Sequence, residues 1–71
     1  MIRVEYNYIS YVDNVDTLRV TVLANSVQEY KEHKNKYYKK ALAMLCKKYD
    51  ITPLQLIHQG YEIIQIIIDE N

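Results

Sequence analysis

The fold follows from the stretch Ile2-Arg3-Val4-Glu5-Tyr6-Asn7-Tyr8, in which apolar and polar residues alternate. A period of two is that of a β-strand with one buried face, because successive side chains of a strand point to opposite faces. We therefore predict a strand over residues 2–12. A second alternation predicts a strand over residues 18–25. Residues 13–17 are rich in Asp and Asn and predict the turn of an antiparallel hairpin between the two strands.

Two helices are expected after the hairpin. Ser26 is a suitable N-cap, and Glu29 stands three residues later, as in a capping box. The helix that they open is expected to run to about residue 48 or 49, with apolar residues on one side and lysines on the other. Thr52 and Pro53 then open a short helix over residues 53–59, which Gly60 ends.

The last strand, residues 61–68, is rich in isoleucine on both of its faces. A strand of this kind lies in the interior of a sheet or against another subunit. The predicted order is therefore β-β-α-α-β in a single α+β domain over residues 1–71. We expect a three-stranded, mainly antiparallel sheet, with the last strand beside the first and with one long and one short helix.

The composition limits the classes of protein. With 71 residues the core is small, since a domain of this size buries only about 60% of the surface of its unfolded chain. Cys46 is the one cysteine, which predicts a reducing, cytoplasmic location. The first residues do not form a signal peptide. The longest apolar run is far shorter than the ~20 residues of a membrane span, so we expect no membrane insertion.

The formal net charge is zero, but the charges are unevenly placed. Residues 26–49 hold seven lysines and two glutamates, a net charge of +5, and the remaining residues carry −5. Helical phase places four of these lysines opposite the apolar side, and they form a candidate partner-binding face: Lys36, Lys39, Lys40 and Lys47. Phosphates or an acidic protein would bind such a face. This helix contains no arginine, the main base-reading side chain, which weakens the nucleic-acid interpretation.

Residues 41–58 resemble a helix-turn-helix pattern. Leu45 and Cys46 take the positions of an apolar and a small residue late in the first helix, and Asp50 takes the turn position where glycine is usual. The positions that pack the two helices together are Tyr49, Ile51 and Leu56. It implies that the second helix contacts bases in a groove of DNA. The side chains available for such contacts are Gln55, His58 and Gln59, none of which carries a fixed positive charge.

The sequence holds no pattern that is typical of a catalytic or metal site. The donors His33, Cys46 and His58 do not have the short spacing of a zinc site. Cys46 is expected near a helix C-terminus, which does not favour a reactive thiolate. A chain with one glycine has no phosphate-binding loop. We therefore predict a protein that is not an enzyme and that uses no cofactor and no metal.

An apolar patch is expected on the sheet face away from the long helix, formed by Ile9, Tyr11, Tyr61, Ile63 and Ile67. Such a patch, or an unpaired strand edge, predicts a homodimer. The predicted function is a small non-enzymatic protein-binding or regulatory module, with an unspecified protein partner. The alternative is a nucleic-acid-binding regulator that uses the lysine-rich helix. The abundance of Lys, Ile, Asn and Tyr is compatible with a mobile-element or phage origin.

Overall fold

A computed structural model describes residues 1–12 and 17–70, and it confirms the predicted order of elements. The strands are β1 (Ile2–Ser10), β2 (Thr17–Ala24) and β3 (Tyr61–Asp69). The helices are α1 (Val27–Glu32), α2 (Lys34–Tyr49) and α3 (Pro53–His58). Of the predicted turn, residues 13–16 lie outside the described part of the chain, and Thr17 belongs to β2. The first strand ends at Ser10, two residues before the predicted end.

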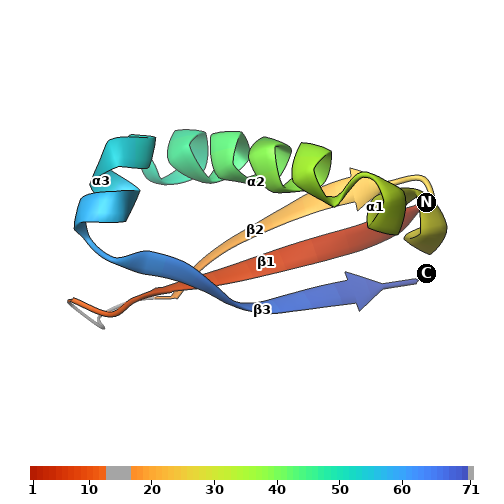
Figure 1. Ribbon diagram of the computed structural model, residues 1–71, viewed down its shortest axis with the longest axis horizontal. Helices are drawn as coiled ribbons and strands as arrows, with labels where there is room; N and C mark the ends of the chain where they lie inside the picture. The colour runs from red at the N-terminus through yellow and green to blue at the C-terminus, as the bar shows by residue number, and fades with distance from the viewer. Residues whose placement is uncertain (13–16, 71) are drawn as a thin grey trace.

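The sheet has the strand order β2-β1-β3, and both pairings are antiparallel. The last strand therefore lies beside the first, as predicted. The helices form one layer over one face of this sheet, and α2 runs along the side of β2 rather than over β3 (Figure 1). The other face of the sheet carries no further element within the described residues, and we call it the open face.

The core lies between the helix layer and the sheet. Every second residue of β1 and β2 points into it, and Tyr37, Ala41 and Leu45 of α2 close it from above. Leu45 and Val4 are both fully buried. The alternation in the two strands thus gives the sheet its buried face.

The long helix is interrupted, contrary to the prediction of one helix from residue 26 to about residue 49. His33 has φ −127° and ψ 39°, which ends α1 and precedes α2. The break brings the buried rings of Tyr30 and Tyr37 to a centroid distance of 5.8 Å. The Tyr37 hydroxyl donates a hydrogen bond to the Glu29 carboxylate, and this bond raises the pKa of Tyr37.

Local hydrogen bonds fix the corners. Ser26 caps α1 by accepting from the Glu29 amide at 3.1 Å, and Thr52 and Gln55 form a complete capping box at α3. Asp50 adopts a left-handed conformation at the end of α2, with φ 54°. Gly60 also has a positive φ, of 67°, and a Cβ at this position would meet Val12 Cγ2 at 3.0 Å. Glycine is therefore required at the turn into β3.

A bulge in β3 changes which face its residues occupy. The register between β1 and β3 shifts between Asn7 and Tyr8, which leaves Ile64 as an extra residue in β3. Before the bulge, Ile63 lies opposite Tyr8, on the helix side of the sheet. After it, Ile66 lies opposite Tyr6 on the helix side, and Ile67 lies opposite Glu5 on the open face. The bulge thus distributes the isoleucines of β3 over both faces.

Candidate functional site

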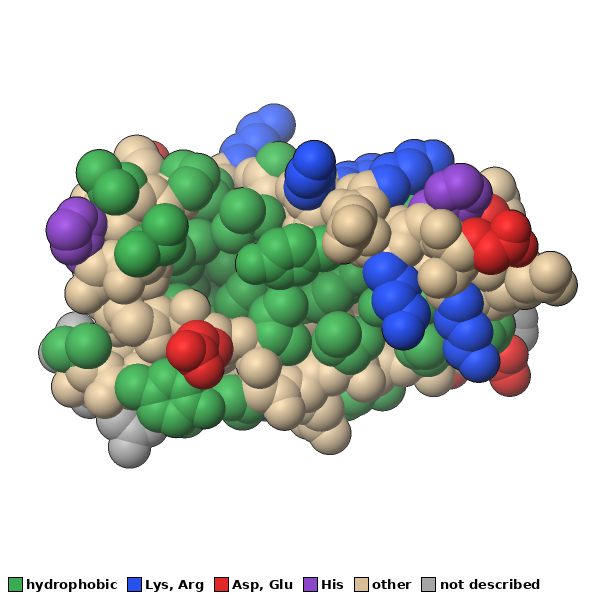
Figure 2. Space-filling view, viewed as in Figure 1, with side chains coloured by type: hydrophobic (Ala, Val, Ile, Leu, Met, Phe, Trp, Pro, Cys, Tyr) green, Lys and Arg blue, Asp and Glu red, His purple; other side chains and the backbone are tan. Residues whose placement is uncertain are grey.

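An apolar groove lies between α2, α3 and β3, because α2 covers β2 and leaves β3 uncovered. Figure 2 shows apolar side chains gathered in this hollow, with lysine or arginine side chains along its upper rim. It contains a cavity of about 140 Å³ near α3. The lining residues are Tyr8, Tyr38, Leu42, Pro53, Leu56, Ile57 and Tyr61. A cavity of this size accommodates one apolar side chain, since a cavity of about 150 Å³ holds benzene.

Three elements position this lining. Tyr38 and Leu42 stand one turn apart on α2 and share the side that faces β3. The Thr52 capping box directs α3 back over the sheet, where Leu56 is buried and Ile57 remains 74% exposed. The cavity therefore depends on the α2–α3 corner.

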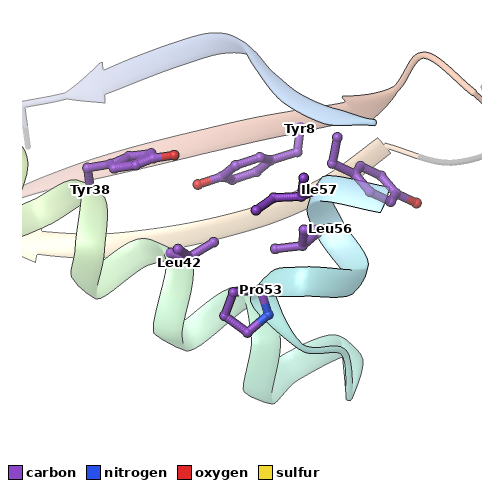
Figure 3. A pocket seen from close by; sticks show the side chains of 7 residues that line it. Tyr8, Tyr38, Leu42, Pro53, Leu56 and Ile57 are labelled. Atoms are coloured by element: carbon purple, nitrogen blue, oxygen red, sulfur yellow. The ribbon is translucent and has the colours of Figure 1, made fainter. Parts of the chain in front are cut away.

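The Tyr8 hydroxyl is the one polar atom of this cavity that is buried without a hydrogen-bond partner among the described residues. Tyr8 is 3% exposed, and Figure 3 shows that its hydroxyl and that of Tyr38 point toward one another. Burial, with smaller contributions from Tyr38 and Cys46, raises the pKa of Tyr8 to about 12. By contrast, the Tyr6 hydroxyl donates to the Tyr30 hydroxyl at 3.3 Å.

Tyr8→Phe is expected to leave the protein as stable as the wild type or more stable by up to about 1 kcal/mol, because it removes a buried hydroxyl that has no partner. Tyr6→Phe removes a hydroxyl that donates a hydrogen bond, and it should cost about 1 kcal/mol. Urea denaturation of both variants measures the difference. A loss of stability in Tyr8→Phe equal to that in Tyr6→Phe would contradict this description of the cavity.

Alkaline pH is expected to destabilise the fold. Burial raises the pKa of both Tyr6 and Tyr8 above 10, whereas in the unfolded chain both ionise near pH 10. The unfolded chain therefore binds fewer protons between pH 10 and pH 12, and the free energy of unfolding falls there by roughly 1.4 kcal/mol per pH unit for each tyrosine. Thermal unfolding from pH 8 to pH 12 tests this, and Tyr8→Phe should show a smaller slope that is not zero, because the raised pKa values of Tyr6 and Tyr37 still contribute. A flat profile would contradict it.

The outer edge of β2 is protected by α2. The Arg19 amide donates to the Tyr49 hydroxyl at 3.1 Å, and the Lys48 ammonium donates to the Arg19 carbonyl at 3.0 Å. The Lys48 ammonium also lies 5.2 Å from the centroid of the Tyr49 ring. Side chains thus occupy backbone groups that another strand would need, and a charged side chain stands beside this edge.

The outer edge of β3 has no comparable protection. Within residues 1–12 and 17–70, no side chain donates to or accepts from the backbone of this edge. The strand contains neither proline nor lysine. Four of its five isoleucines are well exposed: Ile64 at 49%, Ile66 at 45%, Ile67 at 41% and Ile68 at 37%. We call these four residues and the adjacent unpaired backbone the β3 edge.

The five residues predicted to form a dimer patch are not brought together. Tyr61 and Ile63 lie on the helix side and pack against the core, whereas Ile9 and Ile67 lie on the open face, and Tyr11 lies beyond the end of β1. The prediction of one shared face was wrong because the bulge separates Ile67 from the other two residues of β3. The open face itself is largely polar, with rows such as Arg19, Asn7 and Gln65.

The four lysines of the predicted basic face, Lys36, Lys39, Lys40 and Lys47, are all exposed on α2. Tyr37 points into the core, and Tyr38 is 42% exposed beside the cavity. Within the described chain no ion pair joins these lysines to a carboxylate. Lys36 lies 5.5 Å from the centroid of the Tyr37 ring. The lysines therefore form a solvent-facing stripe on the side of α2 away from the core.

The described residues contain no group of three or more His, Cys, Asp or Glu side chains that could hold a metal ion. None of their helices is both long enough and apolar enough to cross a membrane. Comparison with known protein families, curated proteins and solved structures gives no match to this chain.

Sequence reasoning missed the cavity beside Tyr8, and it named an unpaired strand edge without identifying it as that of β3. The isoleucine run over 63–68 was the available signal for the edge. The cavity had none, because its lining comes from three elements that only the fold brings together.

Proposed function

We propose that the chain is a small non-enzymatic protein-binding or regulatory module that acts as a homodimer. The observation that carries this proposal is the β3 edge, where four isoleucines are 37–49% exposed beside an unprotected strand edge. An exposed apolar edge of this kind pairs with another chain or aggregates unless it is covered. A small domain with a marginal core also gains stability from a second subunit.

The protein partner is expected to be acidic where it meets α2, because the lysine stripe carries four positive charges and pairs with no carboxylate among the described residues. In the dimer such a partner would be bound or tethered through the lysines, while the β3 edge holds the two copies together.

Light scattering after size-exclusion chromatography tests the proposal. We expect a species of about 17 kDa, twice the 8.5 kDa of the chain, at low and at high salt and with or without mixed nucleic acid. A chain that stays at the mass of one copy at all concentrations would refute the homodimer.

The second candidate function is a nucleic-acid-binding regulator. The observation that favours it is the exposed stripe of Lys36, Lys39, Lys40 and Lys47. Binding of this kind weakens steeply with salt, with a slope near −0.9 for each phosphate contacted on a duplex. Steep salt dependence of the affinity for mixed DNA would favour this candidate over an acidic protein partner.

Replacement of Lys36, Lys39 and Lys40 by glutamate should abolish any binding of DNA or of an acidic protein by α2. The side chains are exposed, so we expect the melting temperature to change little. Affinity for mixed DNA and the melting temperature are the two measurements. Unfolding of the triple variant would contradict the placement of these lysines, and unchanged DNA affinity would exclude the stripe as a phosphate-binding surface.

A further inference from the structure

We infer that two copies of the chain pair along β3, antiparallel and centred on Ile67, and so form one continuous six-stranded sheet. This inference rests on the proposed homodimer and names the edge, the register and the occupant. We call the pairing the Ile67 register. In it, Ile67 lies opposite Ile67 of the second copy, and Ile66 lies opposite Ile68.

The choice of edge follows from the difference between the two outer strands. At β2, Tyr49 and Lys48 hydrogen-bond to the backbone of Arg19, so pairing there would have to displace them. At β3, the unpaired backbone lies beside exposed isoleucines on both faces. Within the described residues, the β3 edge therefore combines backbone groups that no side chain occupies with four exposed isoleucines, whereas β2 has Arg19 occupied and Leu23 as its exposed large apolar residue.

Alternation along the ladders shows which backbone groups of β3 are free. The amide and carbonyl of Arg19 point away from β1, so Arg19 and its cross-strand partner Asn7 do not hydrogen-bond to each other. The amide and carbonyl of Asn7 therefore point to the other side of β1, toward β3. By the same alternation Glu5 faces β3 and bonds to Ile67. The amides and carbonyls of Ile66 and Ile68 therefore point outward, and the Ile67 register joins them in two reciprocal pairs.

The side chains select the same register. Directly opposite residues of an antiparallel pair share a face, so the centre must fall on a residue and not between two. Centring on Ile67 opposes Gln65 to Asp69 and leaves no carboxylate opposite another. Centring on Ile66 would oppose Glu62 to Glu70, and centring on Ile68 would oppose isoleucine to Asp69 and Glu70. The Ile67 register keeps Ile66, Ile67 and Ile68 against isoleucine and an amide against a carboxylate, and it opposes an isoleucine to a carboxylate only at Ile64 and Glu70, at the end of the pairing.

The occupant is a second copy because this strand is complementary to itself. In the Ile67 register each outward backbone group of Ile66 and Ile68 finds its partner in the same strand of the other copy. A strand from an unrelated protein could supply the backbone bonds. It would not be expected to match the isoleucines on both faces.

Cysteine cross-linking tests the register. In a background with Cys46→Ala, we expect Ile67→Cys to form an intermolecular disulfide under mild oxidation. Opposite Cα atoms in such a pair lie about 4.5–5.5 Å apart, within the range of disulfides. Ile64→Cys is the matched control on the same strand and face, because copies of residue 64 would lie roughly 20 Å apart along the strands. Leu23→Cys is the control on β2, at 52% exposure.

A second variant guards against a folding defect at position 67. The double variant Gln65→Cys with Asp69→Cys changes two exposed polar residues. In the Ile67 register, the cysteine at position 65 of one copy lies opposite the cysteine at position 69 of the other copy. We expect it to cross-link as Ile67→Cys does, with far-ultraviolet circular dichroism like that of the wild type.

The outcomes separate the two proposals. A wild-type dimer in which neither Ile67→Cys nor the double variant cross-links would overturn the β3 pairing and leave the homodimer in place. Cross-linking of Ile64→Cys or Leu23→Cys as fast as Ile67→Cys would also overturn it. A wild type that stays a single copy by light scattering would overturn both proposals. The same result is expected if only a different protein covers β3.

Discussion

Replacing Leu45 with alanine will lower the free energy of unfolding by about 3–4 kcal/mol. Leu45 is fully buried on the face of α2 that meets the sheet, so the variant leaves a cavity in the core between the sheet and the helix layer. A chain of 71 residues is stable by about 4–10 kcal/mol in total. The variant should therefore be partly unfolded at 37 °C.

Urea denaturation at a fixed protein concentration measures the effect, since the midpoint of the proposed dimer would depend on concentration. Met44→Ala is the matched control, because Met44 directly precedes Leu45 on the same helix and its side chain is 40% exposed. We expect the control to lose less than about 1 kcal/mol. Equal losses in the two variants would show that α2 meets the sheet through a different face.

Replacing both Ile66 and Ile68 with lysine is expected to raise the dissociation constant of the dimer at least ~100-fold. In the Ile67 register each of these residues lies opposite the other in the second copy. The variant therefore replaces two apolar cross-strand pairs with two pairs of like charges. Both side chains are more than one-third exposed in the single copy, so the fold itself should tolerate the change.

Sedimentation equilibrium over a range of concentrations measures this dissociation constant. The matched control is Thr21→Lys with Leu23→Lys, which adds the same charge at two exposed positions of β2, the opposite edge strand. We expect the control to dimerise like the wild type. If both double variants dissociate equally, the loss reflects net charge and not the β3 edge.

The regular parts of the fold could be predicted because each is encoded locally. The alternation of β1 and β2, the Ser26 and Thr52 caps and Gly60 each act within a few residues of the chain. The break at His33 could not be predicted in this way. No glycine or proline marks it, and its structural correlate is the packing of Tyr30 against Tyr37, which depends on the position of the sheet.

The bulge in β3 had no local signal either. Residues 63–68 are all isoleucine except Gln65, so they fit either register, and the choice depends on pairing with β1. This one residue decides which face Ile67 occupies. For the same reason the predicted dimer patch was wrong in composition, and its cover by a second copy stays a prediction.

The protection of β2 by Tyr49 and Lys48 also required the fold. These residues lie about 30 positions from Arg19 in the chain, and nothing in their spacing relates them to a strand edge. Once they are placed, the two edges of the sheet differ, and β3 is the less protected of the two.

Hydrogen exchange at the amides of Ile66 and Ile68 tests the β3 pairing most directly, because these amides point away from β1. We predict that both are protected to the same degree as the neighbouring amide of Ile67, and that their protection falls when the protein is diluted below the dissociation constant. Exchange of Ile66 and Ile68 at the rate of unpaired amides at every concentration, with Ile67 still protected, would contradict the account.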